Sequence, residues 1–370
     1  MRTLLVLPDL FRAEGGIARM MRLYLKALGT GCAPGDNIDI VTLLDKGDTT
    51  AQARQLAGQA LGKVVNCAGS RTRFAFAVLR HSFSADRIVC GHVFHLILAR
   101  LARLLRPGLK YHLVAHGIEV WRNYSHWERL ALRGAERIFC VSEYTRRQML
   151  RYEPRLEPAR LLVVPNSFDP ALARNAAVPG PAPSGVAAPR ILVVSRLLAT
   201  DPYKGVDLMI EALPLIRREF PAAHLRIVGT GDDAPRLGEL ARRLDVAAVV
   251  HFAGRLDDSA LEREYAECDL FALPSRKEGF GLVYLEAMAH GKPCLAARAG
   301  GAPEVVGLPG STGLTGGTPV GALVEYGHVD EIALAVSDIV RHPRDPAVIR
   351  ARADQFAFPA FAARLRAALA

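Results

Sequence analysis

Two glutamates eight positions apart carry the strongest chemical signal in the sequence. Glu278 and Glu286 stand in residues 275–306, which read SRKEGFGLVYLEAMAHGKPCLAARAGGAPEVV. A strand-like apolar run precedes them, and Gly279 and Gly281 open a predicted helix. The free N–H groups and the dipole of such a helix start favour an anion, and glycines let a ligand approach the main chain. The stretch therefore predicts an anion site flanked by two carboxylates.

The spacing of the glutamates suggests a different task for each. If the helix begins near Gly281, Glu286 lies about 7.5 Å along its axis. Glu278 would then lie in the loop, beside the outer end of a diphosphate, and Glu286 farther along, where sugar hydroxyls are held. We expect both carboxylates to face one ligand. An ordinary βα unit with surface acids is the alternative for a lone pair of glutamates.

The glutamate spacing, the flanking glycines, EAMAHGKP and the later GGAPE resemble the retaining glycosyltransferases of family four, which use nucleotide sugars. The resemblance implies an α/β chain with the GT-B fold, in which two doubly wound, Rossmann-like parallel-sheet domains face each other across a cleft. It implies that Glu278 contacts the transferred sugar and that Glu286 holds the ribose hydroxyls. It also assigns donor binding to the helix start, namely to Gly279, Phe280, Gly281 and Leu282.

A pair of cations follows the first predicted strand of the second half, in the stretch SRLLATDPYKGVD. By the same resemblance Arg196 and Lys204 grip the donor diphosphate, with Ser195 beside them. Two fixed cations can neutralise a departing diphosphate, and no D-x-D pattern occurs in the sequence. We therefore expect no metal and no cofactor. A surface charge is the alternative for Arg196 taken alone.

Three residues of the first half are candidates for the same site. Gly15 and Gly16 follow the first predicted strand, but not as the G-x-G-x-x-G fingerprint, which weakens an NAD-binding interpretation. A lone Gly-Gly is usually a turn, and only the resemblance implies that this backbone approaches the diphosphate. His116 should emerge at the carboxyl end of a strand, and the resemblance implies contact with the donor sugar. A lone histidine is more often structural, and the neighbouring Glu119 fits an early helix acid.

Two further residues are assigned to the nucleobase by resemblance alone. Gly229 opens GTGDD and Arg255 stands in GRLDD, and both stretches follow strand-like runs. Neither identifies the base.

Length and composition indicate two α/β domains. The chain has 370 residues, half of them apolar, yet no run of eighteen is apolar throughout, and the N-terminus does not resemble a signal peptide. The six cysteines are scattered without metal-ligand spacing, as in a reduced, cytoplasmic protein. Short apolar runs alternate with helical patterns, which predicts parallel sheets. The expected strands are residues 3–7, 38–43, 63–67, 87–90, 111–115, 137–141 and 161–164, then 190–194, 225–228, 249–253, 270–273, 294–297 and 322–324.

The domain boundaries follow from these runs. We expect an acceptor-side domain at 1–168, a linker at 169–189 that is rich in proline and alanine, and a nucleotide-sugar-binding domain at 190–356. The resemblance implies that a final helix within 357–370 packs back on the first domain.

The charge of the chain is concentrated in its first half. Residues 1–185 hold 26 Lys and Arg against 14 Asp and Glu, whereas residues 186–370 hold 21 against 23. No nucleic-acid-binding signature accompanies the excess, so an anionic membrane or a lipid-diphosphate acceptor fits better. Residues 94–108 place Arg100, Arg103 and Arg106 among Leu and Ile, and residues 71–80 repeat the mixture. The alternative is a sheet-covering helix with a solvated arginine face.

We therefore expect a retaining, metal-independent glycosyltransferase that acts at the inner face of the cell membrane. The stretch DPYKGVDLMIEALP and the basic first domain resemble bacterial polysaccharide mannosyltransferases, which makes GDP-mannose the first candidate donor. The acceptor would be a glycan or a polyprenol- or lipid-linked sugar in cell-surface polysaccharide or glycolipid synthesis. UDP-glucose and UDP-N-acetylglucosamine remain open as donors. A nucleotide-sugar hydrolase or epimerase, and a non-catalytic nucleotide-sugar-binding protein, are the alternative functions.

Overall fold

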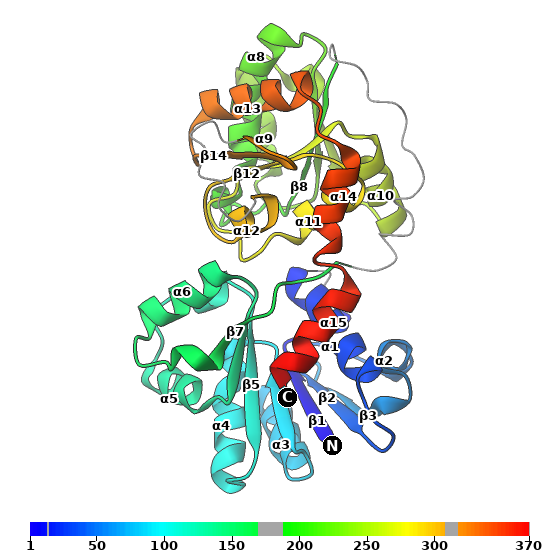
Figure 1. Cartoon of the computed structure of the whole chain (residues 1–370), viewed down its shortest axis with the longest axis vertical. Coiled ribbons are helices and arrows are strands. Elements are labelled where there is room, and N and C mark those ends of the chain that lie inside the picture. The colour runs from blue at the N-terminus through cyan, green and yellow to red at the C-terminus, as the bar shows by residue number, and fades with distance from the viewer. Residues whose placement is uncertain (13–14, 169–187, 308–316, 370) are drawn as a thin grey trace. The chain divides into compact units, whose positions relative to one another are not determined.

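The computed structural model describes residues 1–12, 15–168, 188–307 and 317–369. The chain divides into two compact units, and each contains one seven-stranded sheet (Figure 1). Unit 1 comprises Met1–Ser167 with Phe358–Ala370, and unit 2 comprises Phe168–Ala357.

The sheet of unit 1 is parallel throughout, in the order β3-β2-β1-β4-β5-β6-β7. Helices cover both of its faces, so its central strands are continuous apolar runs, and Leu4 to Leu7 of β1 are all fully buried. The strands are β1 Arg2–Leu7, β2 Asn37–Thr42, β3 Leu61–Asn66, β4 Arg87–Cys90, β5 Lys110–Ala115, β6 Arg137–Cys140 and β7 Leu161–Val163.

The helices of unit 1 form two groups. α3, α4 and α5 pack side by side, and α1 packs against both α2 and the C-terminal α15 (Figure 1). The Tyr24 and Phe361 rings meet edge to face between α1 and α15, with centroids 5.1 Å apart. The helices are α1 Gly16–Thr30, α2 Thr50–Ala57, α3 Arg71–Ser82, α4 Leu96–Leu105, α5 His126–Gly134, α6 Glu143–Tyr152 and α15 Phe358–Leu369, with short 3₁₀ turns η1 Gly58–Ala60, η2 Val93–His95, η3 Ile118–Val120 and η4 Pro158–Arg160.

Unit 2 repeats the arrangement with the strand order β10-β9-β8-β11-β12-β14-β13. Its strands are β8 Arg190–Val194, β9 His224–Val228, β10 Val250–Gly254, β11 Leu270–Leu273, β12 Cys294–Ala297, β13 Gly317–Thr318 and β14 Gly321–Val324, and β13 alone is antiparallel to its neighbour. Its helices are α8 Val206–Glu219, α9 Ala234–Arg243, α10 Asp258–Glu267, α11 Leu282–Ala289, α12 Ala302–Val306, α13 Val329–Arg341 and α14 Pro346–Asp354, with 3₁₀ turns η5 Pro202–Lys204 and η6 Ala247–Val249.

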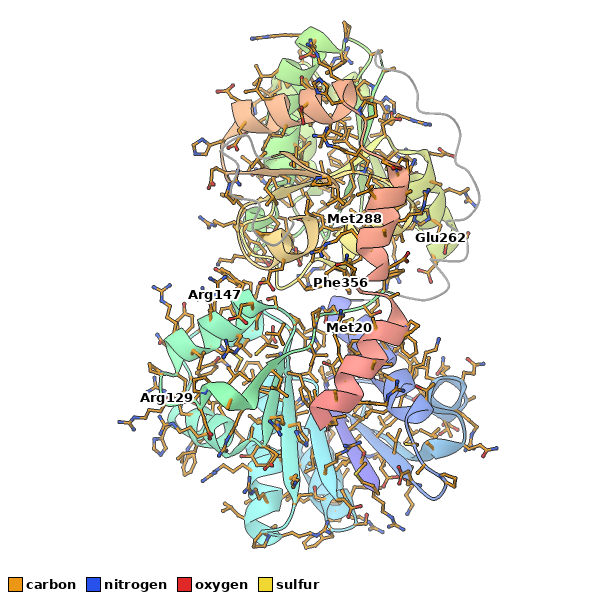
Figure 2. The ribbon with its side chains drawn as sticks, in the orientation of Figure 1. Met20, Arg129, Arg147, Glu262, Met288 and Phe356 are labelled. Carbon is orange, nitrogen blue, oxygen red and sulfur yellow. The ribbon has the colours of Figure 1, made fainter. Side chains whose placement is uncertain are left out.

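Every strand expected from the sequence is present, with ends within two residues of the expected ones. The two-residue β13 was not expected, because so short a run has no detectable alternation. The expected linker falls mainly on residues 169–187, which lie outside the described residues. Phe356, which follows α14 and is labelled in Figure 2, packs against Phe280 of the candidate site, with ring centroids 5.4 Å apart.

Candidate functional site

The candidate site of unit 2 lies where its strand order reverses. β8 is flanked by β9 on one side and β11 on the other. The strands that follow β8 in the chain, β9 and β10, lie on one side of it, and the later strands, from β11 on, lie on the other side. In open α/β sheets the carboxyl ends of the strands at such a point form the ligand crevice. Residues 195–205 follow β8 and residues 274–281 follow β11, so both predicted motifs lie at this edge.

These two loops bring Lys204 and Glu278 into contact. Lys204 Nζ donates to Glu278 Oε2 at 2.8 Å, and each side chain is only 16% exposed. Gly205 allows the approach, because its φ of +71° is left-handed and a Cβ there would lie 2.6 Å from the Pro274 carbonyl oxygen. The Arg276 N–H also donates to the Tyr203 carbonyl at 2.8 Å. The predicted cation and the predicted sugar-contacting carboxylate therefore form one ion pair.

The Gly-Gly pair after β12 fixes the backbone that carries Glu278. The Gly301 N–H donates to the Glu278 carbonyl at 2.6 Å. Gly300 has a φ of +64°, and a Cβ there would lie 2.5 Å from the same carbonyl oxygen. GGAPE was part of the family resemblance, but the sequence alone did not show that these glycines position Glu278.

The start of α11 is built for close approach. Gly281 is its N-cap with a φ of +100°, and a Cβ there would lie 2.3 Å from the Tyr284 ring. Within the described part of the chain, no side chain forms a cap hydrogen bond at this helix start. The first N–H groups of the helix, beginning at Leu282, therefore face no capping side chain and suit an anion.

The expected donor contact of Phe280 does not come from its side chain. Phe280 is 2% exposed and packs on Phe356. This residue can serve a ligand only through its backbone. The carbonyl group of the neighbouring Gly279 packs against Gly301. A Cβ added to Gly301 would lie 2.2 Å from the Gly279 carbonyl oxygen.

Arg196 and Lys204, expected to act together, have different acidic partners. Arg196 is 66% exposed and pairs with Asp201 at 2.9 Å, and the two residues line a small polar pocket with Asp233 and Arg236. The Ser195 hydroxyl donates to the Arg196 carbonyl at 3.0 Å. The exposed Arg196 side chain is thus placed to exchange Asp201 for a ligand anion.

Glu286 lies deeper than a surface acid. It is 4% exposed and its Oε2 accepts a hydrogen bond of 2.9 Å from the Tyr265 hydroxyl. Tyr265 is fully buried and stacks on His290, with ring centroids 5.7 Å apart. Tyr265 was not identified from the sequence, because it stands in a different helix and has no spacing signal that links it to Glu286.

The two nucleobase candidates differ in how the structure uses them. Gly229 has a φ of +138°, and a Cβ there would lie 1.8 Å from the Ser195 carbonyl oxygen. The packing of the backbone therefore explains this glycine, and no ligand is needed to account for it. Arg255 is exposed and follows β10, at the outer edge of the sheet. Only Arg255 has a side chain that can reach a base.

In unit 1 the strand order reverses between β1 and β4, and the loop after β1 is held there by Asp45. Asp45 is 1% exposed and accepts hydrogen bonds of 2.8 Å from the N–H groups of both Leu10 and Arg12. Gly15 is the N-cap of α1, and a Cβ there would have nothing within 4 Å among the described residues. The backbone at Gly15 and Gly16 is exposed and open to a ligand. Asp45 is a positioning residue that sequence reasoning missed.

His116 emerges at the carboxyl end of β5, as expected. Glu119 holds its backbone by accepting from the N–H groups of His116 at 2.5 Å and Gly117 at 3.2 Å, and burial raises the Glu119 pKa. Burial, followed by the charge of His92, lowers the His116 pKa to about 3. His116 Nε2 is buried and has no hydrogen-bond partner among the described residues. The imidazole is therefore neutral near pH 7 and offers an unsatisfied nitrogen to a ligand.

Two features of the described residues bear on partners. No group of three or more His, Cys, Asp and Glu side chains there is arranged to hold a metal ion. None of the described helices has the length and apolar character needed to span a bilayer.

Two family models match the chain. The model described as "Glycosyltransferase Family 4" matches residues 15–172, and the one described as "Glycosyl transferases group 1" matches residues 188–342. The matches contain His116 in the first half and all the unit 2 candidates in the second.

Curated relatives match over part of their length. A GDP-mannose-dependent alpha-(1-6)-phosphatidylinositol monomannoside mannosyltransferase of Mycolicibacterium smegmatis is 40% identical over 168 residues, which cover 44% of this chain and 41% of the relative. A D-inositol 3-phosphate glycosyltransferase of Kineococcus radiotolerans is 33% identical over 241 residues, covering 61% and 54%. The chain thus spans about two fifths to one half of these relatives.

Solved structures share the fold over the whole chain. HepE from Anabaena in complex with UDP has a TM-score of 0.75 at 20% identity and covers 100% of this chain and 99% of its own. The apo form of the lipopolysaccharide outer core galactosyltransferase WaaB has a TM-score of 0.73 at 18% identity, with the same coverage. The two parallel-sheet units are those of the GT-B fold.

Proposed function

We propose, since the chain belongs to the family-four glycosyltransferases, that it transfers a hexose from a nucleoside diphosphate sugar to an acceptor hydroxyl with retention of anomeric configuration. The observation that carries the proposal is the Lys204–Glu278 pair beside the uncapped start of α11. A cation and a helix N-terminus suit the diphosphate, and the adjacent carboxylate suits the sugar attached to it.

We propose a front-face reaction at this site. The acceptor oxygen forms a bond to the anomeric carbon while the bond from that carbon to the diphosphate oxygen breaks. The departing oxygen takes the proton of the acceptor hydroxyl, so attack and departure occur on the same face and no glycosyl-enzyme forms. Lys204, Arg196 and the N–H groups at the start of α11 stabilise the charge that develops on the diphosphate. We propose that they do so without a metal ion or cofactor.

Glu278 and His116 orient the sugar in this proposal. Glu278 accepts hydrogen bonds from sugar hydroxyls, and the resemblance alone assigns the neutral His116, with its unpaired Nε2, to the sugar. Glu286, held by Tyr265, accepts hydrogen bonds from the ribose hydroxyls. We propose Arg255 as a contact for the base, and the resemblance alone assigns the backbone at Gly15 and Gly16 to the diphosphate.

The proposed donor is GDP-mannose and the proposed acceptor is a lipid-linked sugar at the inner face of the cell membrane. The mannosyltransferase relatives support this choice, because they are described as GDP-mannose-dependent and as acting on phosphatidylinositol monomannoside. The basic first half supports an anionic acceptor surface.

Thermal unfolding in the presence of GDP, UDP, ADP and their sugars tests the proposal, because a ligand that binds only the folded chain raises its Tm. We expect GDP and GDP-mannose to give the largest increase. Incubation of the stabilising nucleotide sugar with a lipid-linked acceptor should then yield an α-linked product by NMR. Hydrolysis or epimerisation without transfer would favour the alternative enzymes, and binding without any turnover would favour a non-catalytic protein.

A further inference from the structure

An apolar strip covers the outer surface of two helices of unit 1. It consists of Ile97, Leu101, Leu104 and Leu105 on α4, Phe76 on α3 and Phe83 directly after α3, and these six side chains are 39–66% exposed. We refer to these six residues as the α3–α4 apolar face. α3 and α4 pack against each other (Figure 1), and Phe83 and Leu105 line one small surface pocket where they meet.

The core does not require this face. The opposite side of α4 already packs into unit 1 through Leu96, Ala99 and Ala102, which are at most 3% exposed. Leu101 and Leu104 stand four and seven positions after Ile97, which places all three on one helix face, away from that core. An exposed apolar patch of this kind marks a contact with something outside the chain.

The arginines of α4 do not screen the strip from water. Arg103 donates to the Gly134 carbonyl at 2.6 Å, and Arg106 donates to the carbonyls of Ser82 and Ala85. Arg100 forms a hydrogen bond with the Tyr111 hydroxyl. A solvated arginine face on this helix, the alternative raised by its sequence, is therefore wrong: the outer face is apolar and the arginines hold neighbouring elements.

The basic residues beside the strip come from α3. Arg71, Arg73 and Arg80 are exposed, and neither α3 nor α4 contains an acidic residue. The surface therefore pairs an apolar strip with exposed cations, of which Arg73 and Arg80 lie on the same side of α3 as Phe76, on a half of the chain that already carries excess positive charge. Such a pairing is typical of a segment that lies in the interface of an anionic bilayer.

We propose that the α3–α4 apolar face docks on an anionic lipid bilayer. Its Leu, Ile and Phe side chains enter the boundary between headgroups and acyl chains, while Arg71, Arg73 and Arg80 contact the headgroups. A second copy of the chain is a poorer occupant, because a two-fold contact through this face would bring the same arginines together. The inference deepens the proposed function, on which it rests for the lipid-linked acceptor, by naming the surface through which the enzyme reaches that acceptor.

Co-sedimentation of the full chain with vesicles tests the docking surface. Vesicles of phosphatidylcholine are compared with vesicles in which a third of the lipid is phosphatidylglycerol. We expect the chain to pellet with the anionic vesicles at low salt and to stay in the supernatant with the neutral ones. Replacing Arg71, Arg73 and Arg80 together by Gln should lower the partition coefficient about 100-fold, at about a factor of five for each charge.

The apolar part is tested by Leu101→Gln, Leu104→Gln and Leu105→Gln in one variant. These side chains are already exposed, so the variant should fold, and we expect its partition coefficient to fall at least about tenfold. Leu334→Gln on α13, where the leucine is 70% exposed, is the matched apolar control. The charge control is a variant in which three exposed arginines of unit 2 are changed together to Gln, namely Arg218, Arg243 and Arg263. This variant loses the same charge as the α3 variant, and its vesicle binding should stay within about twofold of the parent.

Equal recovery with neutral and anionic vesicles, or variants that pellet like the parent, would overturn the proposal. A second outcome would also overturn it: the parent is a dimer, whereas the leucine variant is a monomer that binds vesicles as the parent does. The α3–α4 apolar face would then be the contact with a second copy of the chain. Nucleotide-dependent Tm increases, measured on the same samples without lipid, distinguish this failure from a failure of the proposed function, because they do not involve the α3–α4 apolar face.

Discussion

Lys204 Nζ and Glu278 Oε2 lie 2.8 Å apart, although their residues are separated by 74 positions in the chain. The contact joins the cation assigned to the diphosphate with the carboxylate assigned to the sugar. A donor must therefore replace or share this ion pair when it binds. Since both side chains are largely buried, the pair is held in a preorganised position.

Replacing Glu278 by Gln should separate binding from turnover. The variant keeps the shape of the side chain and frees Lys204 for the diphosphate, so the Kd for the nucleoside diphosphate should stay unchanged or fall. Turnover should drop about 100-fold or more, because the sugar loses a charged hydrogen-bond acceptor. Calorimetry measures the Kd and donor consumption measures kcat. Glu239→Gln, at an exposed position of α9, is the control, and an undiminished kcat in the Glu278 variant would refute the role.

Replacing Tyr265 by Phe should weaken recognition of the ribose. Without the 2.9 Å hydrogen bond, Glu286 is no longer held toward the nucleoside. We expect the preference for a ribonucleotide donor over its 2′-deoxy analogue, measured as a ratio of kcat/KM values, to fall about tenfold.

The control for this change is Tyr24→Phe. Tyr24 is also buried, but its hydroxyl has no hydrogen-bond partner among the described residues. An equal loss of the ribose preference in both variants would show that Tyr265 acts only through packing.

Replacing Gly300 by Ala should impair catalysis through the backbone of Glu278. The new Cβ would lie 2.5 Å from the Glu278 carbonyl oxygen, so the loop must shift. We expect kcat to fall about tenfold or more, since small displacements of a positioning group are costly. Gly327→Ala is the matched control, because Gly327 also has a positive φ of +89° but a Cβ there meets nothing within 4 Å. Similar kinetic losses in both variants would attribute the effect to backbone strain alone.

Buried histidines should make unit 1 sensitive to acid. Burial, followed by the charges of Arg87, Lys110 and Arg137, lowers the pKa of His112 from 6.5 to about 3, and the side chain is 4% exposed. As the pH falls, His112 therefore takes up a proton in the unfolded chain before it does so in the folded chain. The free energy of unfolding is highest above about pH 6.5 and decreases as the pH falls toward about 3. The loss is up to about 2 kcal/mol at about pH 5.

His112→Phe tests this dependence, because Phe keeps a ring against Phe139, which His112 stacks on at 5.6 Å. Urea unfolding at about pH 7 and about pH 5 should show a smaller loss of stability in the variant than in the parent. His251→Asn, at an exposed position of β10, serves as the control. An identical pH dependence in parent and His112 variant would contradict the prediction.

The sequence was sufficient for the strands and for the loops that carry the site, because apolar runs and glycines are local signals. It predicted that residues 195–205 and 274–281 serve one ligand, but not that Lys204 pairs with Glu278, since that contact depends on β8 lying beside β11. Asp45 and Tyr265 were missed for the same reason: each acts on a residue that is distant in the chain.

Side-chain direction was the other property that the sequence did not determine. The periodicity of α4 indicated a basic amphipathic helix, with a solvated arginine face as the alternative. In the structure Arg103 and Arg106 instead reach the carbonyl groups of neighbouring elements, which leaves the leucines outside. Long arginine side chains can reach such carbonyls from the flank of a helix, and a helical pattern alone does not specify their targets.

Calorimetric titration of nucleoside diphosphates is the most direct test of the central claim that Lys204 and the start of α11 hold a donor diphosphate. Parent, Lys204→Met and Lys63→Met are titrated with GDP, UDP and ADP, Lys63 being an exposed lysine of β3. We predict that the parent binds at least one of them, that Lys204→Met weakens it at least about tenfold, and that Lys63→Met leaves it unchanged. A parent that binds none of the three, or a Lys204→Met variant that binds as tightly as the parent, would contradict the account.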